Sequence, residues 1–417
     1  MQKPLLKCFF LSIDRHLGSR SFLLIAIAGF VFLLTNAGCG HITPYYGPND
    51  SLPPEYMTTD GDVKYRILLI GDAGEPNKEK DEPVLQTLRQ WAEVMPQKTM
   101  IIFLGDNIYE RGMPQKRDTD AREEAERRLL AQLRVVKANE AHGLRGLFIP
   151  GNHDWAKGGK DGQETVKQQA QYVNQILSDN ENFLPKGGCP GPAMPTMVDK
   201  HGVRVIVLDT QWWLHNKEWK PTILCPQGDK DAVINKLKDL LQSGEDQQVM
   251  VVAHHPLASH GPHGGFFDWK DHLFPVTHLV EWLWIPTPIV GSLYPIARQH
   301  WVKSKQDLAG SDNKDMVRRL KKALEEVRSK TKPLIYAAGH EHSLQVLRGD
   351  SAHYILVSGA GSKAKVTPVS HGDDTLFAHS HPGFMAVDFM KDRRVLLRVI
   401  EPGGKGVVFL KWLDTNG

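Results

Sequence analysis

The stretch that decides the fold is VKYRILLIGDAG, residues 63–74, in which an apolar run stops at glycine and aspartate. A short apolar run closed by turn residues is typical of a buried strand. Similar runs follow at residues 100–104, 147–149, 203–208, 249–253 and 334–338. Helical spacing of apolar residues occupies several intervals between them, over residues 81–94, 120–141, 229–242 and 314–329. Strands that alternate with helices predict an α/β domain.

The last part of the chain has a different pattern, with runs rich in β-branched residues. These runs, which predict a closing sheet, cover residues 354–357, 384–389, 395–400 and 407–410. Because the chain has no internal repeat, we predict one folded domain over residues 62–413. Within it, residues 255–332 contain the proline-broken aromatic piece Trp282–Pro286 and are interpreted as an insertion or lid.

The first 39 residues have the layout of an export signal. A basic leader precedes the apolar run 22–34, which at about 13 residues is shorter than the ~20 that a membrane-spanning helix needs. The sequence Ala37-Gly38-Cys39 resembles a bacterial lipoprotein cleavage box, in which Cys39 would be lipidated, although Asn36 stands where leucine is preferred. Lipoprotein, secreted protein and uncleaved anchor are all open interpretations. Each predicts export to the periplasm or cell envelope, and two of them allow membrane attachment.

Residues 40–61 contain proline, glycine and tyrosine without periodicity, which predicts a linker. The formal charge of the whole chain is +3, and the first 20 residues account for it. The near-neutral remainder has no electrostatic footprint for nucleic acid. Cys189 and Cys225 are the only cysteines of the predicted body, and they either form one disulfide or stay as two thiols.

Five short motifs follow five of the apolar runs: Gly71-Asp72-Ala73-Gly74, Gly105-Asp106-Asn107-Ile108-Tyr109, Gly151-Asn152-His153-Asp154, Val251-Val252-Ala253-His254-His255 and Gly339-His340-Glu341-His342. The loops beyond the carboxyl ends of strands are where sites assemble in α/β sheets. Carboxylate, amide, phenol and imidazole groups suit iron, zinc or manganese. Each motif alone is a weak signal, but the ordered set is specific.

The ordered set resembles the signature of the purple acid phosphatases, within the calcineurin-like phosphoesterases. The resemblance covers residues 71–342 and implies a two-sheet sandwich flanked by helices, with a dinuclear metal site at the strand ends. Most of the wider superfamily has a ligating histidine two residues after the first aspartate, where this chain has Gly74. Tyr109 stands where purple acid phosphatases place a phenolate, which prefers trivalent iron. A packing role for Tyr109 is the alternative.

The resemblance also implies a ligand set for two metal ions, iron(III) and a divalent ion (iron, zinc or manganese). The first ion would be held by Asp72, Asp106, Tyr109 and His342. The second would be held by Asp106, Asn152, His254 and His340, so that Asp106 bridges both ions.

The implied activity is hydrolysis of phosphate monoesters by a metal-bound hydroxide. His153 would face the leaving oxygen, Asp154 would orient or charge His153, and His255 would contact the phosphate. Both histidines have a purely structural role as the alternative. Four other histidines, His260, His263, His379 and His381, are left outside the predicted site.

Other functions are compatible with the same residues. A phosphodiesterase or nucleotide pyrophosphatase would use the same metals, and an exported scaffold would keep the fold without catalysis. Trp282, Trp284 and Trp301 would serve either the core or docking to a membrane or partner. The expected partner is a small phosphorylated substrate, and no protein partner is implied.

Overall fold

The computed structural model of the chain describes residues 43–48, 50, 60–178, 181–185, 201–215, 230–243, 247–274, 298, 304–328, 330–362, 366–403 and 406–415. The predicted export signal with Cys39, the pair Cys189 and Cys225, and the tryptophans 282, 284 and 301 lie outside these residues. Among the helices within them, none combines the length and the apolar character needed to cross a membrane. Residues 40–417 form one compact unit.

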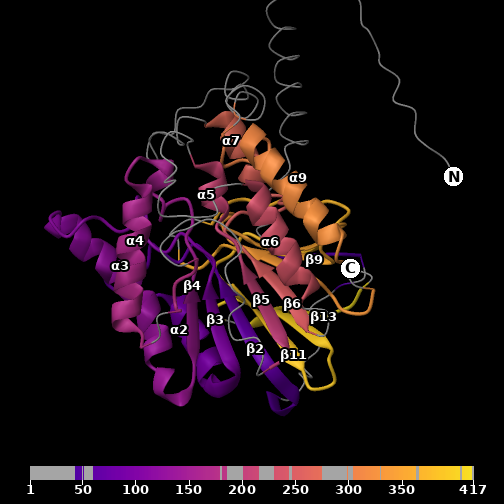
Figure 1. Cartoon of the computed structure of the whole chain (residues 1–417). Helices are drawn as coiled ribbons and strands as arrows, with labels where there is room; N and C mark the ends of the chain where they lie inside the picture. The colour runs from indigo at the N-terminus through magenta and orange to yellow at the C-terminus, as the bar shows by residue number, and fades with distance from the viewer. Residues whose placement is uncertain are drawn as a thin grey trace, which may run out of the picture. The chain divides into compact units, whose positions relative to one another are not determined.

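Two sheets form the centre of this unit (Figure 1). The six-stranded sheet has the order β13-β12-β11-β2-β3-β4, and its β2, β3 and β4 are parallel. Its strands are β2 (Val63–Ile70), β3 (Thr99–Phe103), β4 (Arg145–Phe148), β11 (Phe384–Met390), β12 (Val395–Ile400) and β13 (Val407–Leu413). The seven-stranded sheet has the order β1-β10-β8-β9-β7-β6-β5, and β5, β6, β7 and β9 are parallel. Its strands are β1 (Tyr45–Tyr46), β5 (Val203–Val207), β6 (Gln248–Val252), β7 (Ile335–Ala338), β8 (Leu344–Arg348), β9 (Tyr354–Ser358) and β10 (Thr375–His379).

The hydrophobic core has an inner and an outer part because side chains alternate along each strand. On β2, Ile67 and Leu69 pack with residues of the other sheet such as Val205 in the space between the sheets. Leu68 and Ile70 point the other way, into the cluster that includes the helices. Each sheet is therefore apolar on both faces, which is why the parallel strands read as continuous apolar runs.

Helices cover the outer faces. In Figure 1, α2, α3 and α4 lie beside β2, β3 and β4, while α5, α6 and α9 lie beside β5 and β6. The helices are α2 (Pro83–Glu93), α3 (Thr119–Lys137), α4 (Gly162–Ile176), α5 (Thr210–Leu214), α6 (Lys230–Gln242), α7 (Trp269–Leu273) and α9 (Ser311–Glu325). On α9, Met316, Leu320 and Leu324 are buried in the core, so this part of the predicted lid belongs to the domain body.

The predicted α/β two-sheet sandwich is confirmed, with three corrections. The late β-branched runs do not form one closing sheet, since β9 joins the seven-stranded sheet and β11 to β13 join the six-stranded one. Tyr45 and Tyr46, predicted to be linker, pair with β10 as an edge strand. The short strands β8 and β10 and the glutamine-rich α4 were not predicted because their apolar residues are few and interrupted.

A buried ion triad supports the six-stranded sheet from its helix side. Arg66 on β2 donates two hydrogen bonds to Asp388 on β11, with N–O distances of 2.6 and 3.0 Å. Arg398 on β12 forms an ion pair with the same carboxylate. All three side chains are almost fully buried, and both guanidinium groups lie over the ring of Trp91 on α2. The triad therefore joins three neighbouring strands to a covering helix.

Candidate metal centre

The predicted ligands gather where parallel strands of both sheets end. Asp72 follows β2, Asp106 follows β3 and Asn152 follows β4 in one sheet, whereas His254 follows β6 and His340 follows β7 in the other. Because the carboxyl ends of parallel strands share one edge, this topology brings five distant motifs together.

The backbone is unusual at three of these positions. Asp72, Asp106 and His340 have φ angles of 58°, 52° and 71°, in the left-handed region that side chains other than glycine rarely adopt. Such conformations cost about 1–3 kcal/mol each and persist only where the surroundings enforce them. Each of the three turns directs a polar side chain into the space between the sheets' ends. Their clustering marks this edge as a functional site.

One half of the cluster is built around Tyr109. Its hydroxyl donates a hydrogen bond to Asp72 Oδ1 at 2.9 Å and lies 3.1 Å from His342 Nε2. The same nitrogen of His342 is 3.3 Å from Asp72 Oδ1. Burial, together with the carboxylates of Asp72 and Asp106, raises the pKa of the Tyr109 phenol well above its usual value. The phenol is thus neutral without a nearby cation, and a bound metal ion would favour the loss of its proton.

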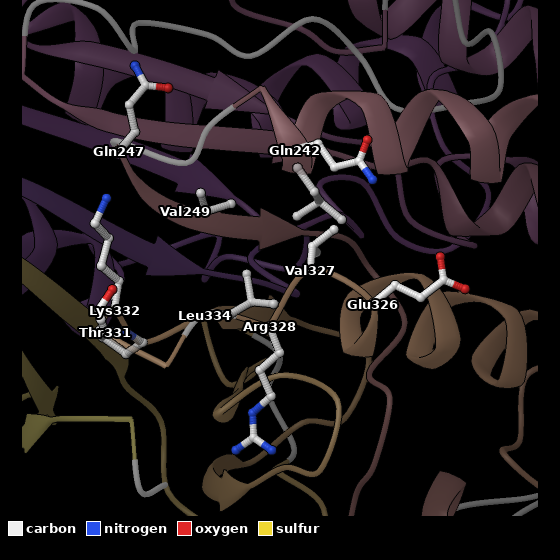
Figure 2. Close-up of a pocket in the computed structure, with 11 residues that line it drawn as sticks. Gln242, Gln247, Val249, Glu326, Val327, Arg328, Thr331, Lys332 and Leu334 are labelled. Carbon is white, nitrogen blue, oxygen red and sulfur yellow. The ribbon is translucent and has the colours of Figure 1, made fainter.

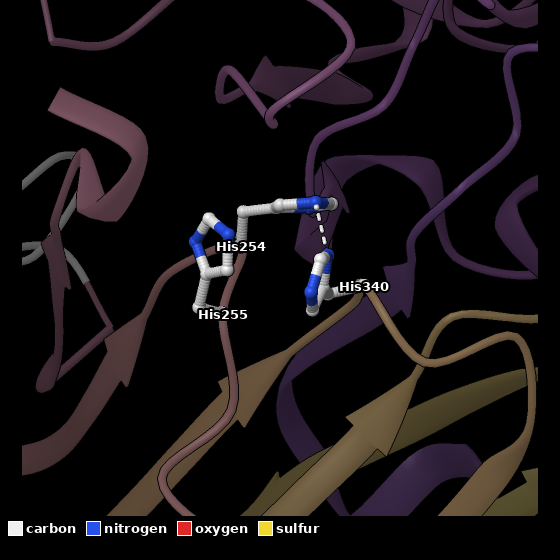
Figure 3. Close-up of side chains that lie close together, drawn as sticks. All are labelled: His254, His255 and His340. Carbon is white, nitrogen blue, oxygen red and sulfur yellow. Dashed lines mark hydrogen bonds between the residues drawn. The ribbon is translucent and has the colours of Figure 1, made fainter. Parts of the chain in front are cut away.

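The other half contains Asn152, His254 and His340. Asn152 Oδ1 lies 2.9 Å from His254 Nε2 and 3.0 Å from His340 Nδ1, and these two nitrogens are 3.2 Å apart. Figure 3 shows the rings of His254 and His340 directed at one another.

The hydrogen bonds on the far sides of these rings decide where the protons are. His254 Nδ1 donates to the carbonyl oxygen of Leu104 at 2.9 Å, and His340 Nε2 donates to that of Gln306 at 3.0 Å. Carbonyls only accept, so in the neutral rings, the form that binds a metal ion, the facing nitrogens carry lone pairs. Three lone pairs, counting that of the Asn152 oxygen, then converge within hydrogen-bond distance. Neutral rings would repel one another here, so this half of the cluster needs a positive charge. That charge is either a proton on His254 Nε2, which the raised pKa of His254 favours, or a metal ion, which these donor atoms fit.

Asp106 lies between the two halves. Ligand atoms of Asp72, Asp106 and His254 are all within 4.8 Å of one another, and Asp106 Oδ2 is 3.4 Å from His254 Nε2. Burial alone would raise the pKa of Asp106, but the imidazoles of His254 and His153 outweigh it and hold that pKa far below its usual range. The same ion pair raises the pKa of His254 to about 9 despite its burial. Asp106 is therefore an ionised carboxylate placed to touch both ion positions.

Gly74 explains why the chain lacks a histidine ligand at that position. A Cβ atom there would lie 2.5 Å from the backbone carbon of Asn107 and 2.6 Å from the backbone nitrogen of Ile108. The carbonyl of Gly74 also accepts a hydrogen bond from the Tyr109 backbone amide. The loop that carries Asp106 and Tyr109 thus packs directly on Gly74, which leaves no room for a side chain.

Asp154 has a different place from the one predicted. Its carboxylate accepts hydrogen bonds from the backbone amides of Gly151, Asn107 and Ile108, at 2.8–3.2 Å, and from the Asn107 side chain. Burial and the carboxylate of Asp106 raise the pKa of Asp154 to about 7. Asp154 is therefore a positioning residue that ties the Asp106 loop to the Asn152 loop, because amides already surround both of its oxygens.

His153 and His255 lie in different surroundings from one another. His153 is partly exposed at the centre, with Nδ1 2.7 Å from the Glu110 carbonyl oxygen and Nε2 3.9 Å from Asp106 Oδ2. His255 is fully buried, and its two ring nitrogens bond Thr210 and Gln306 at 2.8 Å each. The His255 ring nevertheless lies 4.4 Å from that of His340 and groups with His254 and His340 (Figure 3), so its contact with phosphate stays a prediction.

Three residues near the centre were missed at the sequence level. The ring of His263 lies 4.0 Å from that of His340, and its Nδ1 is 2.7 Å from Asp307. Arg298 donates to both oxygens of Asp307 at 2.8 and 2.9 Å. The signal for His263 was a histidine in a glycine-rich loop soon after a ligand strand. No sequence signal pointed to Arg298 or Asp307, because only the fold brings them there.

A cavity of about 600 Å³ lies elsewhere (Figure 2). It is lined by Val249 near the start of β6 and Leu334 just before β7, together with residues at the ends of α6 and α9 such as Gln242 and Glu326. These are the amino ends of the strands, opposite the edge that carries the histidines and carboxylates. The chemistry therefore resides in the ligand cluster and not in this cavity.

Comparisons with known proteins agree with this geometry. The family model of the calcineurin-like phosphoesterases matches residues 65–283, which are 219 of the 417 residues. His340 and His342 lie beyond that match and are placed by the fold. No curated protein sequence gave a match.

Several solved structures have a similar fold. GAP50, the anchor in the inner membrane complex of Plasmodium, has a TM-score of 0.51 at 15% identity, over 84% of this chain and 88% of that one. A purple acid phosphatase from yellow lupin (Lupinus luteus) has a TM-score of 0.49 at 13% identity, over 84% of this chain and 53% of the enzyme. PhoD has a TM-score of 0.43 at 11% identity, over 88% and 72%.

The family match covers more than half of the chain, and the two-sheet fold with its His/Asp cluster is consistent with it. Members of this family are metal-dependent phosphoesterases with a dinuclear centre. The chain belongs to the calcineurin-like phosphoesterase family.

Proposed function

We propose that the chain is a phosphatase like the purple acid phosphatases, which hydrolyses phosphate monoesters at a centre of iron(III) and a divalent ion. The observation that supports this best is the position of Tyr109. Its hydroxyl lies within 3.1 Å of both Asp72 and His342, in the ligand set of one ion. Phenolate is a hard, anionic ligand that favours trivalent iron, and the backbone around Gly74 excludes the alternative histidine.

Each half of the cluster would supply the ligands of one metal ion. Asp72, Tyr109 and His342 would hold the first ion, and Asn152, His254 and His340 the second, with Asp106 between them. Bound metal ions would lower the pKa of water towards neutrality and offset charge on the phosphoryl oxygens. The chain itself keeps these groups dry and fixed, since Asp72, Asp106 and His254 are buried.

His153 supplies the proton chemistry in this proposal. The Glu110 carbonyl accepts from Nδ1, so Nε2 is the nitrogen that faces Asp106 and the partly open side of the centre. From there His153 can donate a proton or a hydrogen bond to the departing oxygen of the substrate. Arg298 brings a guanidinium group to the same edge, next to His263 and His340, where it is paired with Asp307.

We also propose that the protein is exported, with a leader over residues 1–39 and lipid attachment at Cys39. The basic leader, the apolar run and the Ala37-Gly38-Cys39 sequence support this. Labelling cells with a radioactive fatty acid would show lipidation of the wild type and its loss in Cys39→Ala.

The experiment for the activity uses the full chain and two tyrosine variants. We expect two metal equivalents at the dinuclear centre, a visible charge-transfer band, and faster hydrolysis of an aryl phosphate monoester than of the bis-aryl diester. Tyr109→Phe should lose the band, whereas Tyr172→Phe, on α4, should keep it. Two bound metals with no band would overturn the iron–phenolate assignment, and preference for the diester would favour a phosphodiesterase or nucleotide pyrophosphatase.

A further inference from the structure

A second cluster of metal-ligating side chains lies outside the centre described above. It consists of His379 at the end of β10, His381 two residues later, and Glu401 directly after β12. One ligand atom from each of the three lies within 4.8 Å of the others. The cluster therefore joins the end of a strand in the seven-stranded sheet to the end of a strand in the six-stranded sheet.

The three side chains face one another in an ordered way. The rings of His379 and His381 are stacked, with centroids 5.1 Å apart and an interplanar angle of 12°. His379 Nδ1 is 2.5 Å from Glu401 Oε1, and His381 Nδ1 is 3.3 Å from Glu401 Oε2. Ligand atoms around a tetrahedral ion with bonds of about 2.0–2.2 Å are roughly 3.3–3.6 Å apart. The His381–Glu401 separation matches this, whereas the His379–Glu401 hydrogen bond is shorter and would lengthen when an ion binds. His381 Nδ1 also bonds the Pro382 carbonyl oxygen at 2.9 Å, and an ion at that nitrogen would replace this bond.

Burial supports a ligand here more than a surface salt bridge. His379 is 5% exposed and Glu401 is 7% exposed, whereas the side chain of His381 is 41% exposed. A buried carboxylate is costly unless a cation neutralises it. The exposed ring of His381 provides a route by which an ion and a water ligand would enter.

We propose that His379, His381 and Glu401 form a mononuclear site for a divalent transition-metal ion such as zinc. Two imidazoles and one carboxylate are the ligand types that zinc prefers, and three protein ligands leave one position for water or a small anion. The site holds the ends of β10 and β12 together, so its ion would stabilise the edge between the two sheets. This proposal does not depend on the activity of the dinuclear centre.

The test counts zinc equivalents on the full chain by competition with a coloured chelator. His381→Asn removes the exposed ligand without opening a cavity, and His142→Asn, an exposed histidine at a distant 3₁₀ turn, is its matched control. We expect the wild type and His142→Asn to bind one zinc equivalent more than His381→Asn. If His381→Asn still binds a third zinc ion, its affinity for that ion should be more than about 10–100-fold weaker than in the wild type. Loss of an outer hydrogen-bond partner costs that much, and loss of a direct ligand should cost more.

A second variant and a second readout keep the test decisive. Glu401→Gln should lose the same equivalent, and neither variant should change phosphatase turnover, because both lie outside the dinuclear centre. Equal zinc binding by the wild type and His381→Asn would overturn the proposal and leave the cluster as a hydrogen-bonded pair of histidines on a glutamate. Loss of turnover in parallel with zinc would also overturn it, by showing that the counted ion belongs to the dinuclear centre.

Discussion

The substitution Asp154→Asn separates a positioning role for this residue from a catalytic one. Each oxygen of the Asp154 carboxylate accepts from at least two donors: Oδ1 from the amides of Asn107 and Ile108, and Oδ2 from the Gly151 amide and the Asn107 side chain. An asparagine amide has one oxygen, so its NH₂ group must face one of these pairs whichever way it turns. One buried donor is then left unsatisfied if the NH₂ group replaces Oδ1, because the Asn107 amide also reaches Oδ2, and two are left if it replaces Oδ2.

The expected magnitude follows from the cost of such donors. A buried unsatisfied N–H costs about 1–3 kcal/mol, so with one or two such donors Asp154→Asn should lower the free energy of unfolding by about 1–6 kcal/mol. The amides concerned flank Asp106 and Asn152, so metal affinity should fall as well. Urea denaturation and metal titration should be done at pH 8, above the raised pKa of about 7, so that the wild-type carboxylate is ionised.

His153→Asn is the matched comparison. Its ring makes one described hydrogen bond of 2.7 Å and is partly exposed, so the free energy of unfolding should change by no more than about 1.5 kcal/mol. Metal binding should persist while turnover falls. The reasoning is refuted if Asp154→Asn keeps wild-type stability and metal affinity but loses turnover as His153→Asn does, because Asp154 would then act through His153.

Three further predictions concern packing and charge. Gly74→Ala should destabilise the chain by about 1–3 kcal/mol and weaken metal binding, because its Cβ meets backbone atoms at 2.5–2.6 Å; metal titration that matches the wild type would contradict this. Asp388→Asn should cost about 3–5 kcal/mol in urea denaturation without changing turnover per folded molecule, since Arg66 and Arg398 lose the buried charge they share. Burial raises the pKa of Asp209 to about 7, so the folded acid stays protonated while the unfolded one ionises near pH 4. The free energy of unfolding should therefore fall between pH 4 and 7 by up to about 1.4 kcal/mol per unit, and Asp209→Asn should remove that part of the slope. Identical slopes in denaturation series of both proteins would refute this.

The fold class and the list of candidate ligands were predictable from the sequence. Apolar runs closed by Gly-Asp, Gly-Asn or Gly-His are local patterns, and their order along the chain is visible without coordinates. Strand ends in an α/β sheet converge on one edge, so Asp72, Asp106 and His254 could be expected to meet before any distance was known. The same local patterns did not predict α4, whose many glutamines interrupt its apolar spacing. They also predicted one closing sheet for the late strands, which belong to two sheets.

Only the tertiary structure decided which neighbours each side chain meets. Asp154 and His255 are adjacent in sequence to predicted ligands, yet one binds backbone amides and the other bonds Thr210, and no local pattern indicates either contact. Glu401 reaches His379 only because β10 and β12 end side by side in different sheets. Sequence motifs record what lies within a few residues, whereas contacts between distant loops depend on how the sheets pack, and that is set by the whole core.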